Sequence, residues 1–515
     1  MVHGVKLKLK APSADQQFFL LTLFTGLAAG LVAIALQTSV EHMKHFILPF
    51  GESFELRTFI FGGLLALAGG LLTTRYMKVL AGSGIPRIKI LLAVHHGYIS
   101  TKEWVLKIVA TVLTLGSAVP MGHEAPTIFI AGGVGSSLGR KFGFKEKRLK
   151  DLIYVGSAAG IAAAFNTPIA AVVFVLEEII GSMSTKAMGP ILISALVASI
   201  TASTLHGQNS IFTPLSYSFS DPKELFFYLA VGIVAGVAGP LFISNSIGVK
   251  KITLKFFKHH RLTPMMFAFF LVGALSFVHP KIPGSGLNFL NELLVGQVPG
   301  IQELGLVLVL KFIAIAFCAG SGMSGGIMLP MMLLGACMGG MFGQLSSQLL
   351  GISNIQIGAY CLVGMGAFFA SVIRTPFTSI ILVFEMTRDY RIVLPLMVAN
   401  LVSYVIAEKL YPGSIYEAMA KCDGYELPGH EEDDVLGHLT VASAYEPAVN
   451  TLAHSLPHSE VVYPDQTLTH ALAKLRHNRH QDHLKVVDRL NPKSQLGVLK
   501  LQHILDLISS NHHSP

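Results

Sequence analysis

Glu124 is a single carboxylate inside a long stretch that carries no other formal charge. Between Lys107 and Arg140 it is the only Asp, Glu, Lys or Arg. It directly precedes an apolar helix that starts at Pro126. A carboxylate at a helix N-terminus stands where an anion would bind, because free N–H groups and the helix dipole favour negative charge there. Protonation would withdraw this competitor, so Glu124 is a candidate anion gate; the alternative is an ordinary capping carboxylate.

Two glycine-rich loops offer anion contacts without a formal charge. Residues 82–86 read GSGIP, in which Ser83 supplies a hydroxyl donor and the proline begins a helix. Residues 325–330 read GGIMLP and contain no ionisable group, so any anion contact there must come from the backbone N–H groups of Ile327 and Met328. The alternatives are a plain helix start for the first loop and glycine-mediated helix packing for the second.

The composition indicates which class of protein must position these residues. Hydrophobic residues make up 52% of the 515-residue chain and charged residues 13%, about half of the roughly 25% usual in soluble domains. The charge-free residues 312–373 suffice for more than one membrane-spanning helix, each of which needs about 20 apolar residues. The sequence therefore predicts an integral membrane protein. We assign its net charge of +8 to helix-flanking residues and lipid headgroups rather than to nucleic acid.

The membrane part contains an internal repeat of interrupted apolar runs. Residues 166–177 recur 208 positions later at 374–385, and residues 82–85 recur 202 positions later at 284–287. Pro126 has a counterpart in Pro330, 204 positions away. Matching broken helices in two halves are typical of transporter folds whose site lies near the bilayer midplane. We expect these halves to span residues 15–205 and 225–420.

The adjacent carboxylates Glu177 and Glu178 end another charge-free stretch. Neighbouring residues on a helix point about 100° apart, so the two cannot serve the same face. Glu177 recurs as Glu385 in the second half, whereas Glu178 matches Met386. A feature present in both halves is architectural, and we therefore select Glu178 as the candidate proton relay.

Five motifs in this order resemble the CLC family of chloride channels and chloride/proton antiporters: GSGIP, GHEAP, NTPIAAVVFVLEE, GGIMLP and RTPFTSIILVFEMT. The ordered set is specific although no single motif is. The resemblance covers residues from about 15 to 420. It implies an all-α membrane fold, built as an inverted repeat of broken and tilted helices, in a homodimer whose subunits each have a pore.

The resemblance also implies a set of chloride ligands. Chloride would be held by the hydroxyls of Ser83 and Tyr416 and by the backbone N–H groups of Ile327 and Met328. On its own, Tyr416 would be interpreted as an aromatic residue at the membrane interface. A serine at position 83 matches family members that favour chloride.

The same resemblance assigns the proton path. Glu124 matches the family's external gating glutamate, which blocks the pathway and passes the proton, and Glu178 matches the internal proton-transfer glutamate of antiporters. The channel branch usually has an apolar residue at the second position. The sequence thus predicts a chloride/proton antiporter, a secondary transporter and not an enzyme, with no cofactor. A passive voltage- or pH-gated chloride channel is the alternative, and a receptor with a silent pore is a third hypothesis.

The gate motif departs from the family pattern, because GREGP or GKEGP is here GHEAP. His123 replaces a fixed cation, and since histidine titrates near physiological pH, we expect it to modulate the gate. Ala125 replaces a glycine and is expected to narrow access from outside. Met328 replaces a common phenylalanine, which matters little for a contact made by the backbone.

A change in composition near residue 420 predicts further domains. We expect a transmembrane domain at 1–420, a linker at 421–437 and a small α/β cytoplasmic tail at 438–515 that resembles one CBS motif. Such motifs pair, so we expect pairing across the dimer. Lys500 and His503 stand where nucleotide-binding examples have Ser or Thr and Asp, which argues against nucleotide binding. The cysteines lack metal-ligand spacing, and the histidine-rich tail is interpreted as a solvated basic face, so no metal site is predicted.

The first apolar run follows Lys6, Lys8 and Lys10, which predicts a cytoplasmic N-terminus by the positive-inside rule. With a cytoplasmic tail, both termini lie on the same side. We expect a multi-pass protein of the cell membrane, which is the inner membrane if the cell is Gram-negative, with membrane lipid as its surroundings.

Overall fold

The computed structural model describes residues 14–47, 56–76, 80–94, 97–144, 146–181, 185–206, 223–257, 260–350, 356–425, 441–447, 461–464, 466, 468–477, 483–487 and 495–504. The chain divides into two compact units, Met1–Leu427 and Pro428–Pro515. The N-terminal lysines, most of the expected linker and both chain ends lie outside the described residues.

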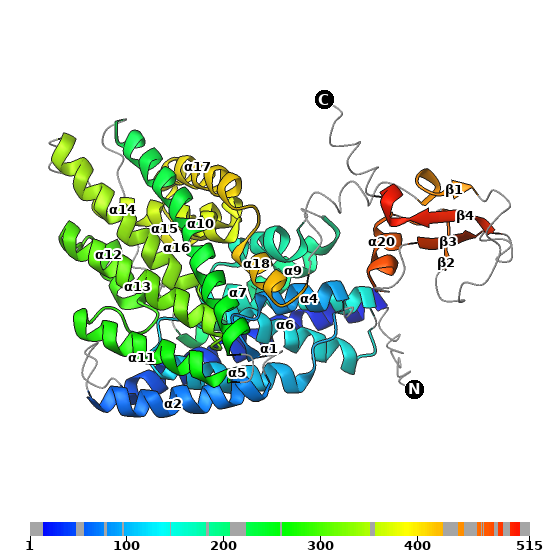
Figure 1. The fold of residues 1–515 in the computed structure, drawn as a ribbon, viewed down its shortest axis with the longest axis horizontal. Coiled ribbons are helices and arrows are strands. Elements are labelled where there is room, and N and C mark those ends of the chain that lie inside the picture. Colours follow the sequence, from blue (N-terminus) through cyan, green and yellow to red (C-terminus); the bar gives the residue numbers. More distant parts are fainter. Residues whose placement is uncertain are drawn as a thin grey trace, which may run out of the picture. The chain divides into compact units, whose positions relative to one another are not determined.

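The helices of the first unit form two series that follow each other along the chain (Figure 1). The first series is α1 (Ala14–Ile47), α2 (Leu56–Arg75), α4 (Ile85–Val94), α5 (Thr101–Gly116), α6 (Glu124–Lys141), α7 (Glu146–Phe165), α8 (Pro168–Phe174), the π-helical turn η1 (Val175–Ile180) and α9 (Thr185–His206). The second is α10 (Glu224–Phe256), α11 (Leu262–Val278), α12 (Leu287–Leu294), α13 (Ile301–Ser321), α14 (Met328–Leu350), α15 (Ile357–Ile373), α16 (Pro376–Thr387), η2 (Tyr390–Ile392) and α17 (Val393–Leu410). Helix α18 (Ile415–Cys422) follows them.

Helix lengths and outward-facing side chains fit a membrane. Among the described residues, seven helical segments are long and apolar enough to cross a bilayer. Others, such as α4 with 10 residues and α16 with 12, are too short to cross alone. Phe226 and Phe277 are 73% and 74% exposed on the protein, which is favourable where the surroundings are hydrocarbon rather than water.

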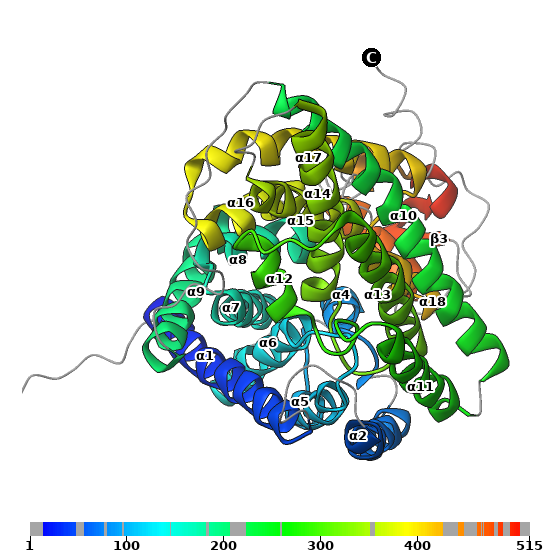
Figure 2. The ribbon, with the colours of Figure 1, turned by 90° about the vertical axis from the view of Figure 1, so that its left-hand side faces the viewer.

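The predicted repeat extends to packing and backbone conformation. Helix α6 packs on α7 as α14 packs on α15, and α8 packs on α9 as α16 packs on α17. Figure 2 shows α1, α2, α9, α11 and α17 around the rim of this unit and α4, α6 and α14 nearer its centre. Asn166 and Arg374 occupy matching places before α8 and α16, and both take positive φ angles, 54° and 70°. The two halves thus repeat even an uncommon backbone conformation.

Two glutamates join the halves by capping each other's helices. Glu177 accepts hydrogen bonds from the N–H groups of Phe377 and Thr378 in the first turn of α16, at 3.2 and 2.8 Å. Glu385 accepts two from the first turn of α8, at 3.1 and 2.8 Å. Each carboxylate satisfies N–H groups that the helix cannot pair itself. Glu177 is therefore architectural, as its recurrence in the second half predicts.

The second unit is a small sheet with a helix. Its four strands lie in the order β1 (Glu446–Pro447), β4 (Gln495–Lys500), β3 (His483–Val487) and β2 (Val461–Val462). Strands β2 and β3 are parallel, whereas β4 is antiparallel to both of its neighbours. Helix α20 (Leu468–His477) connects the parallel pair and contacts β3 (Figure 1). The apolar side chains of Val462, Leu472 and Val486 are buried between helix and sheet.

Candidate functional site

The N-terminal ends of helices α4, α6, α14 and α18 meet where the first and second halves of the unit contact each other. Helix α4 packs on α6 and α18, and α6 packs on α14. The loops before α6 and α14 form an antiparallel bridge, in which Gly122 and Gly326 exchange N–H to carbonyl hydrogen bonds of 2.8 and 2.7 Å. The N–H of Gly82 donates to Met323 at 3.2 Å, so the loop before α4 joins the same crossing. The motifs GSGIP, GHEAP and GGIMLP are thus brought together.

Two buried hydroxyl groups lie beside this crossing. Ser83 is 4% exposed and Tyr416 is fully buried. The Tyr416 side chain is therefore enclosed by protein and does not contact the membrane interface. Neither the Ser83 Oγ nor the Tyr416 OH has a hydrogen-bond partner among the described residues. Ser83 and Ile327 line one small cavity, and Met328 begins α14 directly after it. Because buried polar groups are normally hydrogen-bonded, these donors suit an anion.

Glu124 begins α6 and folds back over the preceding loop. Its side chain is 4% exposed, and its Oε2 lacks a hydrogen-bond partner among the described residues. A Cβ at Gly122 would overlap the carboxylate, so a side chain there would displace Glu124 from this position. Nδ1 of His123 lies 3.6 Å from Oε1 of Glu124. Lys44, at the end of α1, is within electrostatic range of the same carboxylate, which places a second cation near the gate.

Ala125 and Gly326 pack against each other at the crossing. Ala125 is fully buried. A Cβ built on Gly326 would lie 3.0 Å from the Cβ of Ala125, which is closer than side-chain carbons normally approach. The methyl group at position 125 is therefore accommodated because its neighbour is glycine.

Glu178 lies on the turn η1, on a different face from Glu177. Its side chain is 2% exposed, and its Oε1 accepts hydrogen bonds from Lys89 Nζ at 3.0 Å and Ser414 Oγ at 3.4 Å. Tyr416, two residues after Ser414, is within electrostatic range of both Glu124 and Glu178. The residues predicted for gate, chloride and proton transfer thus form one connected region.

Sequence reasoning missed a buried lysine that supports the serine loop. Lys107 is fully buried on α5, and its Nζ donates to the carbonyl groups of Leu80 and Gly82 at 2.7 and 2.6 Å. The second half repeats this device, because the fully buried Lys311 donates to the carbonyl group of Lys281 at 2.9 Å. Lys107 and Lys311 are 204 positions apart in the sequence. This spacing matches the other repeats and could have identified the pair.

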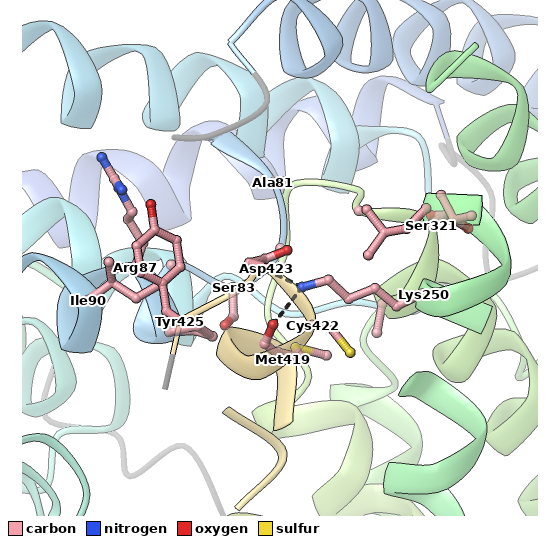
Figure 3. A pocket seen from close by; sticks show the side chains of 18 of the residues that line it. Ala81, Ser83, Arg87, Ile90, Lys250, Ser321, Met419, Cys422, Asp423 and Tyr425 are labelled. Atoms are coloured by element: carbon pink, nitrogen blue, oxygen red, sulfur yellow. Dashed lines mark hydrogen bonds and ion pairs between the residues drawn. The ribbon is translucent and has the colours of Figure 1, made fainter. Parts of the chain in front are cut away.

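A cavity of about 410 Å³ leads to Ser83 from one side of the first unit. Arg87, Lys250 and Arg261 contribute cationic side chains to its lining. Figure 3 shows Arg87 and Lys250 on opposite sides of the cavity with Ser83 between them. Lys250 Nζ donates to Asp423 Oδ2 and to the carbonyl group of Met419, each at 2.9 Å. Because cations outnumber carboxylates in the lining, the cavity attracts anions.

Histidine, cysteine and acidic residues do not form a metal-binding cluster of three or more within the described ranges. The thiols of Cys318, Cys337 and Cys361 are buried in the first unit.

Helix N-termini, hydroxyl groups and a cationic cavity at the crossing of two repeated halves define a membrane protein that binds and moves anions. The chain belongs to the voltage-gated chloride channel family, whose model matches residues 62–408.

Two relatives are similar over most of the chain. A ClcB-like chloride channel protein from Ralstonia nicotianae is 34% identical over 68% of this chain and 84% of its own length. The H(+)/Cl(-) exchange transporter ClcA from Vibrio cholerae is 30% identical over 78% of this chain and 88% of its own length.

Solved structures share the fold. A slow cyanobacterial Cl-/H+ antiporter is 27% identical with a TM-score of 0.71, over 79% of this chain and 97% of the other. A eukaryotic CLC transporter also has a TM-score of 0.71, at 18% identity, over 95% of this chain and 98% of its own. The second likeness concerns the fold alone.

Proposed function

We propose that this protein exchanges chloride for protons across a membrane, as a secondary transporter and not an enzyme. The observation that carries the proposal is that two buried glutamates, Glu124 and Glu178, both lie within electrostatic range of the buried Tyr416. Relatives at 30% identity are named exchange transporters. The transported ions are chloride and protons, and no cofactor takes part.

Chloride is held by donors that carry no formal charge. The hydroxyl groups of Ser83 and Tyr416 donate to it, together with the N–H groups of Ile327 and Met328. The two buried hydroxyls without partners among the described residues support this assignment. A helix N-terminus supplies unpaired N–H groups and a favourable dipole. Holding the anion by dipoles rather than by salt bridges keeps its binding weak enough for release.

Glu124 is the gate and the outer proton acceptor. Its carboxylate competes with chloride at the N-terminus of α6, because both are anions drawn to the same N–H groups. Protonation removes the negative charge and frees the carboxyl group to move away from this position. Glu178 exchanges the proton with the inner aqueous phase. A buried, hydrogen-bonded carboxylate inside a membrane unit supports this role.

His123 modulates the gate through its charge. When protonated, it stabilises the ionised form of Glu124, whose Oε1 is 3.6 Å away. Lys44 from α1 and Tyr416 from α18 also lie within electrostatic range of this carboxylate.

The competing hypothesis is a passive chloride channel, and one similar protein carries the name of a chloride channel protein. The two functions share the chloride ligands, so those residues do not distinguish them. Glu178 does, because a passive channel needs no buried proton acceptor on the inner side. We therefore favour exchange.

The assembly and its surroundings are part of the proposal. We place the protein in the cell membrane as a homodimer surrounded by lipid, with both termini in the cytoplasm. The tail is proposed to be one CBS-like motif, which the order β2, α20, β3 and β4 with its parallel first pair supports. The likeness to the eukaryotic transporter covers 95% of the chain and so extends into this unit. We propose no nucleotide ligand for it.

Flux measurements on vesicles containing the purified protein test the function. A chloride gradient is expected to drive protons uphill through the unmodified protein. Glu178→Val is expected to abolish proton movement while chloride still flows. If the unmodified protein dissipates a chloride gradient without moving protons, it is a channel. Chloride flux that is unaffected by Ser83→Ala and Glu124→Gln would contradict the chloride site itself.

A further inference from the structure

One lysine side chain joins the proton-relay glutamate to a second carboxylate. Lys89 lies on α4, six residues after Ser83, and its Nζ donates to Oε1 of Glu178 at 3.0 Å. The same Nζ donates to Oε1 of Glu417 on α18 at 3.2 Å. Glu417 directly follows Tyr416 in the sequence. Helix α4, which follows the loop of Ser83, the turn η1, which carries Glu178, and α18, which carries Tyr416, therefore meet at this ammonium group.

The three side chains form a gradient from the interior toward the surface. The exposed fractions are 2% for Glu178, 9% for Lys89 and 28% for Glu417. A proton in water therefore reaches Glu417 first. None of the three is among the residues that line the cationic cavity leading to Ser83. The three side chains thus lie outside the lining of that cavity.

The charges of the cluster favour uptake of one proton. Two carboxylates share one ammonium group, so a proton bound by either of them reduces the repulsion between the two. Arg374 is within electrostatic range of Glu417, but its Nε already donates to Glu408 at 2.8 Å. One bound proton removes the excess negative charge, and either carboxylate can carry it while Lys89 pairs with the other.

We propose that Glu417 is the inner proton acceptor and that Lys89 positions it for transfer to Glu178. This inference rests on the proposed exchange function and adds two residues to its proton path. A proton from water forms an O–H bond at Glu417, and Lys89 then pairs with ionised Glu178. The proton passes to Glu178, and Lys89 pairs with ionised Glu417 again. Only O–H bonds form and break, and Lys89 keeps its own protons throughout.

The variant Glu417→Gln distinguishes proton transfer by Glu417 from its structural role in capping α18. Glu417 also caps α18, because its Oε2 accepts from the N–H of Ser414 at 3.2 Å and its own N–H donates to the Ser414 Oγ at 3.3 Å. Glutamine can replace glutamate in such a capping box. It also keeps an acceptor for Lys89. Glu417→Gln therefore removes the titration and leaves the helix end and the lysine contact in place.

The experiment measures proton and chloride movement together in vesicles that contain the full chain. In Glu417→Gln we expect the ratio of proton to chloride flux to fall about a hundredfold, the low end of what one acid–base group contributes. The proton flux should also lose its dependence on inner pH. Glu417→Asp should restore both. Lys89→Met should lower the ratio and Lys89→Arg should retain it, because arginine can bind both carboxylates.

The matched control is Glu292→Gln, which removes from α12 the carboxylate that pairs with Lys281. This variant should behave like the unmodified protein. If Glu417→Gln keeps the normal flux ratio and pH profile while the unmodified protein is coupled, the inference is wrong and the exchange function stands. If the unmodified protein moves no protons, the exchange function is wrong and the inference with it.

Discussion

At the scale of single residues, the gate combines one carboxylate with a titratable neighbour. His123 and Glu124 are adjacent in sequence and 3.6 Å apart at their side chains. An unperturbed histidine loses its charge above a pH of about 6.5. The field on Glu124 should therefore change with pH, whereas an arginine in the same place would hold it constant.

His123→Arg is expected to flatten the pH dependence of chloride flux. The variant and the unmodified protein should agree at low pH, where both carry a cation, and differ most at a pH above about 6.5. There the permanent cation keeps Glu124 ionised and the variant transports more slowly. Chloride efflux from vesicles at a series of pH values measures the effect. His279→Arg serves as the control, because His279 is paired with Glu303 of α13 rather than with the gate. Superimposable profiles for His123→Arg and the unmodified protein would contradict the role of His123.

Some of the site residues could be selected from the sequence and others could not. Glu124 and Glu178 could be selected because a carboxylate inside an apolar stretch is costly and conspicuous. Lys89 and Glu417 could not be paired from the sequence, because they are 328 positions apart and the contact depends on how α4 and α18 meet. Tyr416 was recognised only by family resemblance, since its burial is a property of the fold.

At the scale of elements, the reciprocal caps are expected to stabilise the contact between the halves. Glu177→Gln and Glu385→Gln each remove the negative charge from two hydrogen bonds at a helix N-terminus, which should cost about 1 to 2 kcal/mol. The melting temperature of the purified protein should fall by a few degrees in each variant, and the double variant should fall further. Glu292→Gln, in an ion pair of α12, serves as the control. Unchanged melting in both cap variants would mean that the caps contribute little.

The loop before α4 offers a second prediction about an element. Gly84 has a φ of +95°, and a Cβ there would lie 2.6 Å from the Cβ of Phe129 on α6. Gly84→Ala should therefore push α4 away from α6 and abolish chloride flux. Gly143 has a φ of +75° with nothing within 4 Å, so Gly143→Ala shares the backbone strain without the clash. Its cost should be only about 1 to 2 kcal/mol. Equal flux in the two variants would contradict the tight α4 to α6 contact.

Helix breaks were predictable because glycine and proline interrupt the apolar runs at residues 82–86, 122–126 and 325–330. The repeat predicted the order of the elements and the structural role of Glu177. The π-helical turn η1 was not predictable, because residues 175–180 read VLEEII and suit an ordinary helix. The backbone bridge between Gly122 and Gly326 could not be predicted either, because the local sequence does not determine which loops meet.

At the scale of the whole molecule, we predict two chains per particle. Large apolar side chains remain exposed on neighbouring elements: Ile169 on α8, Leu196 and Ile200 on α9, and Phe377 on α16. They can pack against a second copy or against lipid. Light scattering of the purified protein in detergent, with the detergent mass subtracted, should give twice the mass of one chain. The mass of a single chain would contradict the homodimer.

The central claim is that chloride and protons move in exchange through one site. The most direct measurement follows pH inside vesicles that contain the purified protein, with a chloride gradient and no initial pH difference. The account predicts that protons move uphill as chloride flows down its gradient, and that Glu124→Gln stops the protons while chloride still flows. A chloride flux that leaves the internal pH unchanged in the unmodified protein would contradict it.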